Sequence, residues 1–235
     1  MKALTFLIRL KSPVLATQTD SGEPNSATAF EYLPGSMIRG AMIARMTNSG
    51  DDLPADPDAQ RLFFGGSVRF LNAYPTLPYP ADSKGALRLL PTPKSWRKKQ
   101  SPDGIVDFAI ASDSSDKKPK KLDEAAFAWI SGEKALTYSP RRQMTVHNAS
   151  DDRNRKQAQI STVYRYDALA EGEAFMGVIL GEETLLTQIK PHLTGDVLLG
   201  GSRTGGYGLA EFETATLDAN WQEYTPSAPP ANGKV

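Results

Sequence analysis

The first residues of the chain alternate between apolar and polar positions in a way that predicts a β-strand. Every second residue from Leu4 to Leu10 is large and apolar. The residues between and after them include the cations Arg9 and Lys11. A period of two places these two sets on opposite faces of a strand. One face is therefore expected to pack in a core and the other to become increasingly basic, until Pro13 ends the strand.

A helix is expected after a Pro-Gly turn in the first half of the chain. The pattern of residues 37–46 predicts this helix, and Ser36 stands where an N-cap residue is preferred. Gly40 and Ala44 keep one side of the helix narrow, so that it can approach a sheet closely. Residues 68–74 then predict a second strand, which a run of prolines closes.

The second half of the chain again combines strands with one helix. Residues 163–166 and 174–180 predict strands, and residues 209–215 alternate like a last strand. Between them, residues 182–190 predict a helix with acidic residues first and a lysine last. The order β-α-β-β-α-β predicts an α+β fold with a ferredoxin-like, RRM-like core. A different α+β sandwich is the alternative.

The middle third of the chain lacks a regular pattern. Prolines interrupt it repeatedly, residues 112–121 have low complexity, and a short helix is expected only over residues 123–130. We therefore expect a long basic insertion, or thumb, within one core. The expected division is the first half of the core at residues 1–80, the insertion at 81–160, the second half of the core at 161–218 and a loose tail at 219–235.

Composition restricts the class of protein. The 235 residues are 40% hydrophobic, which is sufficient for a core, and they contain no cysteine. A chain without cysteine forms no disulfides or thiolate metal sites, and this composition favours a reducing compartment. No apolar run is long enough to cross a bilayer, and the first residues are typical of a strand and not of a signal peptide. We therefore expect a cytoplasmic protein with no membrane partner.

Charge is balanced over the whole chain but not along it. The sequence has 27 Lys+Arg and 27 Asp+Glu, which argues against a general polyanion binder. Between Lys94 and Lys156, however, there are 14 Lys+Arg and only 9 Asp+Glu. Basic clusters that share a face are typical of phosphate binding. A solvated insertion is the alternative, above all at residues 117–121.

The most unusual segment is the glycine-rich loop at residues 200–208. Its glycines are Gly200, Gly201, Gly205, Gly206 and Gly208. Glycine lets another backbone approach closely, and successive exposed N–H groups form an anion-binding concavity. In the same loop, Arg203 adds a forked donor for phosphate and Tyr207 adds a ring on which a base can stack. A flexible hairpin connection is the alternative.

Four segments carry motifs, at residues 32–41, 62–75, 163–172 and 201–208. They read YLPGSMIRGA, LFFGGSVRFLNAYP, VYRYDALAEG and GSRTGGYG. Together they resemble the CRISPR RAMP superfamily, whose members build type III effector complexes. The first is similar to its "IPGSSLRGALR" signature and the last to its carboxy-terminal glycine-rich loop. The resemblance covers both ends of the chain, and its spacing is most similar to the type III-D group that caps the guide RNA at its five-prime tag.

This resemblance implies a ferredoxin-like core with an insertion that grips CRISPR RNA. Its implied partners are CRISPR RNA, other protein subunits of a type III complex, and target RNA that pairs with the guide. It assigns Ser36 and Arg39 to the RNA backbone, at a helix N-terminus that favours phosphate. It assigns Arg203 and Tyr207 to RNA at the glycine-rich loop. A simple helix cap for Ser36 and a surface ion pair for Arg39 are the alternatives.

A basic arm is expected before the second half of the core. Its candidate RNA-binding residues are Arg141, Arg142, His147, Arg153 and Arg155. The segment is rich in cations and amides and has few apolar residues. This composition is typical of a flexible arm that becomes ordered on RNA, and a disordered surface loop is the alternative.

Catalysis is a second interpretation of the same family resemblance. The two histidines, His147 and His192, have no metal-ligand spacing, and no Ser-His-Asp set is present. Backbone subunits of type III complexes cut target RNA with an aspartate in the loop before the Pro-Gly-Ser helix, and Asp20 lies in that loop. Asp20 would then act with a divalent metal ion, whereas no cofactor is otherwise expected. An ordinary turn at Asp20 is the alternative. A nucleotide-handling enzyme is a third hypothesis, without the Gly-Lys-Ser/Thr motif of a P-loop.

Overall fold

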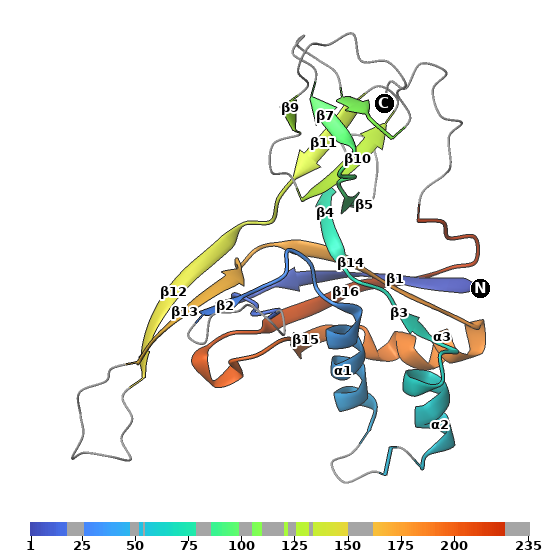
Figure 1. Cartoon of the computed structure of the whole chain (residues 1–235). Coiled ribbons are helices and arrows are strands. Elements are labelled where there is room, and N and C mark those ends of the chain that lie inside the picture. Colours follow the sequence, from blue (N-terminus) through green and yellow to red (C-terminus); the bar gives the residue numbers. More distant parts are fainter. Residues whose placement is uncertain are drawn as a thin grey trace, which may run out of the picture. The chain divides into compact units, whose positions relative to one another are not determined.

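Residues far apart in the sequence combine in the larger of two structural units. The computed structural model describes residues 1–17, 26–47, 52–53, 55–78, 86–98, 105–109, 120–121, 126–131, 134–149 and 162–223. Unit 1 contains Met1–Tyr74 and Pro140–Trp221, and unit 2 contains Pro75–Ser139 and Gln222–Val235. Figure 1 is coloured from blue at the first residue to red at the last, so the two parts of unit 1 can be followed along the chain by their colours. The interruption of unit 1 therefore begins and ends earlier than the expected insertion at residues 81–160.

An antiparallel sheet forms the centre of unit 1. The strands that lie wholly in this unit follow the spatial order β15 (Gly195–Leu198), β16 (Leu209–Asp218), β1 (Lys2–Leu10), β14 (Ala174–Gly181) and β3 (Arg69–Phe70). β1 pairs with both β14 and β16, and all of these pairings are antiparallel. The first strand of the chain therefore lies between two strands from its second half.

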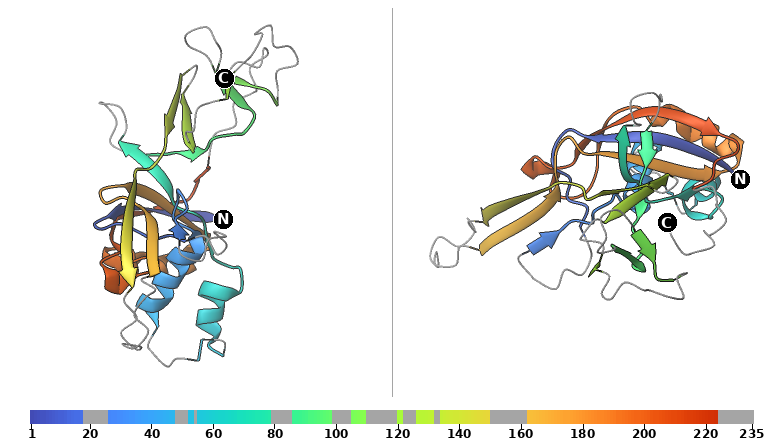
Figure 2. Two further views of the ribbon diagram at one scale, coloured as in Figure 1. Left: turned by 60° about the vertical axis from the view of Figure 1, so that its left-hand side comes forward. Right: turned by 90° about the horizontal axis from the view of Figure 1, so that it is seen from above.

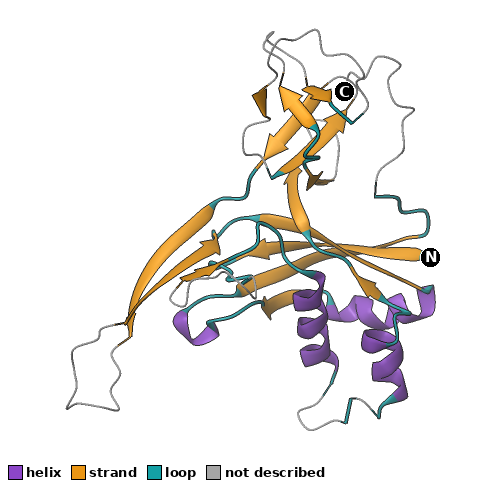
Figure 3. Ribbon diagram, viewed as in Figure 1, coloured by secondary structure: helices purple, strands orange, loops and turns teal. Residues whose placement is uncertain are grey.

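The core of unit 1 lies on one face of this sheet. The alternation in β1 is confirmed, because Leu4, Phe6 and Ile8 are buried whereas Arg9 is exposed. Two helices, α1 (Gly35–Met46) and α3 (Glu183–Ile189), bury residues in the same core cluster. In Figure 3 these helices, in purple, lie on one side of the sheet. The charged positions of β1, β15 and β16 lie on the opposite face, which we call the polar face and which also carries apolar residues of β14, such as the buried Val178.

Helix α1 begins differently from the sequence prediction. It starts at Gly35 with Pro34 as N-cap residue and has no side-chain cap, so the prediction that Ser36 is the N-cap is wrong. The amide oxygen of Asn72 instead accepts a hydrogen bond from the Gly35 N–H, at 2.9 Å. A Cβ at Gly35 would lie 2.0 Å from the carbonyl oxygen of Phe70, so only glycine allows this approach.

The remaining helical segments of the described chain are short. They are α2 (Pro57–Ala59), the π-helix η1 (Gln60–Phe64), and the 3-10 helices η2 (Lys190–His192) and η3 (Arg203–Gly205). Helix α3 and η2 together confirm the helix expected at residues 182–190. Among the described residues, no helix combines the length and the apolar character needed to cross a membrane.

A second, smaller sheet in unit 1 forms an arm. Strand β12 (Arg142–Ala149) pairs antiparallel with β13 (Thr162–Leu169), and β13 pairs in parallel with β2 (Ser26–Thr28). Figures 1 and 2 both show β12 and β13 running side by side, and we call this pair the arm. The expected flexible basic arm is ordered at residues 142–149, because an eight-residue ladder with β13 fixes its backbone.

Unit 2 consists of short strands. They are β4 (Tyr74–Pro78), which begins at the last residue of unit 1, β5 (Ala86–Arg88), β6 (Leu90–Pro91), β7 (Trp96–Lys98), β8 (Ile105–Asp107), β9 (Lys120–Lys121), β10 (Phe127–Ser131) and β11 (Lys134–Tyr138). The helix expected at residues 123–130 is wrong where the chain is described, since β10 pairs antiparallel with β11. The alanines there favour a helix, but the aromatic residues on β10 suit a paired strand.

Candidate nucleic-acid interface

The glycine-rich loop joins β15 to β16 and packs against the segment after β1. The N–H groups of Gly201 and Gly208 donate to the carbonyl oxygens of Leu15 and Pro13, at 3.2 and 2.9 Å. Gly208 has a φ of +95°, and a Cβ there would lie 2.4 Å from the Leu199 carbonyl oxygen. The backbone at this position therefore requires glycine.

The N–H groups of the glycine-rich loop are largely used within the protein. Besides those of Gly201 and Gly208, the N–H of Gly205 donates to the carbonyl oxygen of Ser202 at 2.9 Å, and the N–H of Gly206 donates to the carbonyl oxygen of Arg203 at 3.2 Å. These four donors do not point to a ligand. The expected concavity of exposed glycine N–H groups is therefore wrong for these residues.

The exposed tip of the loop consists of η3 and its neighbours. Arg203 is exposed, and its Nε donates only a long hydrogen bond, 3.4 Å, to the carbonyl oxygen of Gly200. Among the residues that the structure describes, its other guanidinium donors have no hydrogen-bond partner, so they are available to a ligand. The geometry is compatible with the predicted phosphate contact of Arg203, which stays a prediction.

Tyr207, in contrast, lies in the interior. Its side chain is only 6% exposed and belongs to a small cluster with Leu15 and Ala168. Its ring meets the ring of Tyr166 edge to face, with centroids 5.7 Å apart. A ring buried in this way has no open face, so the prediction that Tyr207 offers a stacking surface to a base is wrong.

The arm and the glycine-rich loop meet at the side chain of Tyr207. The Nε2 atom of His147, on β12, lies 3.0 Å from the hydroxyl oxygen of Tyr207. The imidazole also packs against Tyr166, with ring centroids 4.9 Å apart. Two candidate segments, 60 residues apart in the sequence, are thus joined in space. The sequence prediction missed Tyr166, although its spacing of two from Ala168 on one strand indicates the same face.

Arg141 and Arg142 serve the fold at the base of the arm. The Nε of Arg142 donates to the Asp167 carboxylate at 2.9 Å, and its Nη2 donates to the carbonyl oxygen of Ala29 at 2.9 Å. The Nε of Arg141 donates at 2.7 Å to Glu173, whose side chain is only 2% exposed. Arg142 thereby ties the arm to the end of β2, and Arg141 neutralises a buried carboxylate. Their contacts with RNA stay predictions.

The Pro-Gly-Ser turn is a separate feature of the surface. Ser36 and Arg39 are both exposed on α1, and the Nη1 of Arg39 lies 3.4 Å from the Phe63 carbonyl oxygen. Among the described residues, no hydrogen bond, ion pair or ring contact joins Ser36 or Arg39 to the glycine-rich loop. The predicted RNA-backbone role of these two residues is therefore independent of the loop.

Three candidate residues lie outside the part of the chain that the structure describes. They are Asp20, Arg153 and Arg155. The predicted catalytic role of Asp20, and the divalent metal ion that this role requires, therefore stay predictions. Within the described residues, no group of three or more His, Asp or Glu side chains is placed to hold a metal ion.

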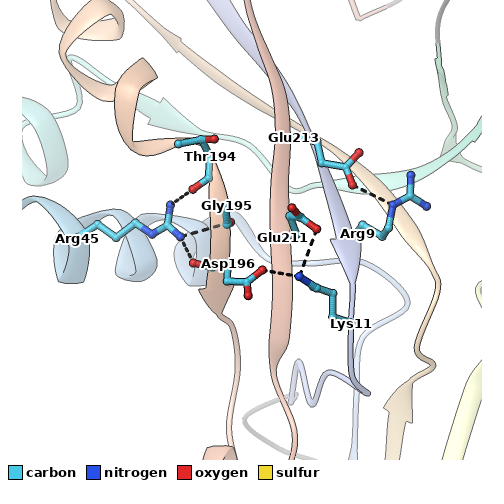
Figure 4. Close-up of polar contacts among 8 residues, drawn as sticks. All are labelled: Arg9, Lys11, Arg45, Thr194, Gly195, Asp196, Glu211 and Glu213. Carbon is cyan, nitrogen blue, oxygen red and sulfur yellow. Dashed lines mark hydrogen bonds and ion pairs between the residues drawn. The ribbon is translucent and has the colours of Figure 1, made fainter.

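The polar face of the central sheet carries paired charges, as Figure 4 shows. Arg9 pairs with Glu213 at 2.9 Å, and the Nζ of Lys11 lies 2.7 Å from Asp196 and 3.4 Å from Glu211. The hydrogen bond with Asp196 raises the pKa of Lys11 against the smaller effect of desolvation. The basic face expected on β1 is thus largely neutralised by β15 and β16, which disfavours binding of a polyanion there.

Arg45 of α1 binds the backbone at the start of β15 (Figure 4). This role was not predicted from the sequence. Its guanidinium donates to the carbonyl oxygen of Thr194 at 2.8 Å and to that of Asp196. It also lies 5.1 Å from the centroid of the Phe212 ring. Burial lowers the pKa of Arg45, opposed by the Asp196 carboxylate. This side chain is therefore part of the scaffold that supports the glycine-rich loop.

Comparison with known proteins indicates what this fold resembles. No protein-family model matches the sequence. No curated protein matches it either. A chain of the type III-B Cmr-β complex bound to cognate target RNA has a similar structure, with a TM-score of 0.51 at 14% sequence identity. That similarity covers 92% of this chain but only 60% of the Cmr-β chain. It shows a shared fold.

Two further structures are more distantly similar. A chain of apo type III-B Cmr-β has a TM-score of 0.47 at 14% identity, over 90% of this chain and 96% of its own. Oligomeric Cmr4 from Pyrococcus furiosus has a TM-score of 0.40 at 11% identity, over 93% of this chain and 98% of its own. At these scores the similarity carries no further conclusion.

Proposed function

We propose that this chain is an RNA-binding subunit of a type III CRISPR ribonucleoprotein effector complex, and that it holds the guide RNA. The observation that carries the proposal is the hydrogen bond of 3.0 Å between His147 and Tyr207. This bond joins the arm to the glycine-rich loop. The sequence predicts RNA binding for each of these two segments on separate grounds. Their meeting in one place is what a shared RNA site requires.

The topology of unit 1 supports the same proposal. The order β16-β1-β14-β3, with α1 after β1 and α3 after β14, is the order of a ferredoxin-like core. We infer that unit 1 is such a core, with β15 added at its edge. This inference agrees with the resemblance of the four motifs to the RAMP superfamily. The fold shared with the Cmr-β chain adds support at the level of architecture.

Charge indicates which surface of unit 1 would meet RNA. Arg203 is an exposed cation at the loop tip, and Arg165 is an exposed cation on the arm, on the face of β13 opposite to Tyr166. The polar face of the sheet is unsuitable, because its cations are paired with Asp196, Glu211 and Glu213. RNA would therefore run along the arm and the loop tip, bound through its phosphates.

The position on the guide is the finer part of the proposal. The motif spacing is most similar to the group that binds the five-prime tag, so we place the chain near that end of the guide. The chain would act there in binding and assembly, together with other protein subunits, while the guide pairs with target RNA.

Co-purified RNA tests this function. The protein, purified from its native host through an affinity tag, is expected to carry short RNAs. Sequencing should show that these RNAs share one five-prime sequence. Binding of the purified chain to single-stranded RNA should weaken with salt, with a slope of about −0.7 per phosphate contact. RNA with random five-prime ends would contradict the position at the tag, and a flat salt response would contradict RNA binding altogether.

A further inference from the structure

Tyr207 links the glycine-rich loop to a part of the protein that the loop backbone does not reach. The backbone bonds of Gly201 and Gly208 run to Leu15 and Pro13, just after β1. The side chain of Tyr207 runs instead to the arm, where its hydroxyl meets His147. The loop is therefore attached at two places: its backbone to the segment after β1, and the side chain of Tyr207 to the arm.

This attachment joins both strands of the arm. The hydroxyl of Tyr207 contacts His147 on β12, while the ring packs edge to face on Tyr166 of β13. His147 and Tyr166 also contact each other, so that each of the three rings touches the other two. A ring held on two sides in this way has little rotamer freedom.

The exposed tip of the loop is attached directly to this buried ring. Residues 203–206 are all exposed, whereas Tyr207, the next residue, is buried. A loop with five glycines in nine residues loses much conformational entropy when it is ordered. Anchoring Tyr207 before RNA arrives means that part of this entropy is already lost in the free protein.

We propose that His147 and Tyr207 form a latch, which positions the tip of the glycine-rich loop against the arm so that Arg203 acts on the same RNA strand as the arm. The two residues are positioning residues and their rings do not contact RNA. This inference rests on the RNA-binding function proposed above and assigns to the pair a role different from direct contact. The latch predicts that the loop is ordered in the free chain and that loss of either partner releases it.

The test uses the full chain with single side chains altered. Tyr207→Phe removes the hydroxyl and keeps the ring, and His147→Leu removes the hydrogen-bonding atoms of the other partner. His147→Gln retains a polar group at the same position and is the conservative variant. Tyr32→Phe is the control, because Tyr32 is a half-buried tyrosine of unit 1 that contacts Tyr74 and lies outside the glycine-rich loop and the arm.

The first measurement is trypsin cleavage after Arg203 in the free chain, followed by mass spectrometry. Tyr207→Phe and His147→Leu should each accelerate this cleavage by about fivefold, since opening of the loop sets the rate. The double variant should be no faster than the single variants, because both remove the same contact. Cleavage after Arg61, which is exposed in η1, should not change. His147→Gln and Tyr32→Phe should resemble the wild type.

The second measurement is affinity for single-stranded RNA at fixed salt. Tyr207→Phe and His147→Leu should weaken binding by about tenfold, the order expected when a contact must be ordered on binding. Arg203→Gln should add no further loss in the Tyr207→Phe background. The salt slope of Tyr207→Phe should equal that of Arg203→Gln, because both lose the same phosphate contact.

The outcomes separate the latch from the function on which it rests. Faster cleavage together with weaker, non-additive binding supports the latch. Weaker binding without faster cleavage overturns it, because the side chains would then contact RNA directly. RNA binding by the wild type with neither readout changed in the variants also overturns the latch, while the proposed function stands. A wild-type chain that binds no RNA overturns the proposed function and, with it, the role of the latch.

Discussion

At the scale of single residues, two glycines of this protein have opposite local environments. Gly208 has a φ of +95° and faces the Leu199 carbonyl oxygen, where a Cβ would lie at 2.4 Å. Gly40 lies on the exposed side of α1, and a Cβ there would meet nothing within 4 Å. The same substitution is therefore expected to have opposite effects at these two positions.

Gly208→Ala should destabilise the protein by about 3 kcal/mol, because it combines a left-handed backbone with a clash against main-chain atoms. Gly40→Ala should stabilise it by about 1 kcal/mol, since alanine has the higher helix propensity and no neighbour obstructs it. Urea unfolding followed by circular dichroism measures both changes. Equal effects of the two substitutions would show that the backbone at Gly208 is not restricted as described.

At the scale of elements, α1 carries two arginines with different roles. Arg45 donates to carbonyl groups at the start of β15 and lies against Phe212. Arg39 is exposed, with one hydrogen bond of 3.4 Å to Phe63. Because Arg45 connects the helix to the strand that leads into the glycine-rich loop, it is a structural residue. Within the described part of the chain, Arg39 is the one of these two arginines that has donors available to a ligand.

Arg45→Met should lower the free energy of unfolding by about 2 kcal/mol, the scale of lost charged hydrogen bonds to partly buried carbonyl groups. Arg39→Met should change it by less than about 0.5 kcal/mol, as is usual at an exposed site. If Arg39 contacts an RNA phosphate, Arg39→Met should also reduce the salt slope of RNA binding by about 0.7. An unchanged salt slope in Arg39→Met would remove Arg39 from the RNA site.

At the scale of the whole molecule, unit 1 is assembled from two separate parts of the sequence. Its core cluster draws on β1 and α1 from the first part and on β14, α3 and β16 from the second. All residues of that cluster lie within unit 1. We therefore expect unit 1 to fold without the residues that interrupt it.

Replacing Pro75–Ser139 with a flexible Gly/Ser linker tests this expectation, because such linkers impose little structure of their own. Amide hydrogen exchange should still show protection in β1, β14 and β16, since the pairings of β1 with β14 and β16 are made within unit 1. Adding Phe212→Asp, which places a charge in the core, should abolish that protection. Loss of protection in the linker variant alone would show that unit 1 depends on the interrupting segment.

Segments with a regular apolar period were predictable from the sequence. Segments in which a local preference competes with a contact to a distant residue were not. The strand from Leu4 to Leu10 and the helix after β14 were predicted correctly, because apolar periodicity directly reports which side chains are buried. Residues 127–130 were predicted as part of a helix but form β10, because pairing with β11 outweighs the helix propensity of alanine. The N-cap role of Ser36 failed since Asn72, distant in sequence, accepts the hydrogen bond from Gly35.

The candidate site shows the same division between local pattern and long-range contact. Glycines, cations and aromatic residues are recognisable in any sequence, so the glycine-rich loop and the basic arm could be identified by themselves. Their burial could not, because it depends on neighbours from other segments. Tyr207 is buried by Tyr166 and His147, and Arg142 is paired with Asp167, two interactions that no spacing along the chain reveals.

The sequence by itself determined the α+β class, the faces of the periodic strands and helices, and the segments that could meet RNA. These properties follow from the order of residues along a regular backbone, whose period is known in advance. Only the tertiary structure decided which cations are neutralised, which aromatic rings are buried, and that the arm and the glycine-rich loop touch through His147 and Tyr207. Each of these depends on a distance between residues remote in the chain, and such distances exist only once the chain has folded.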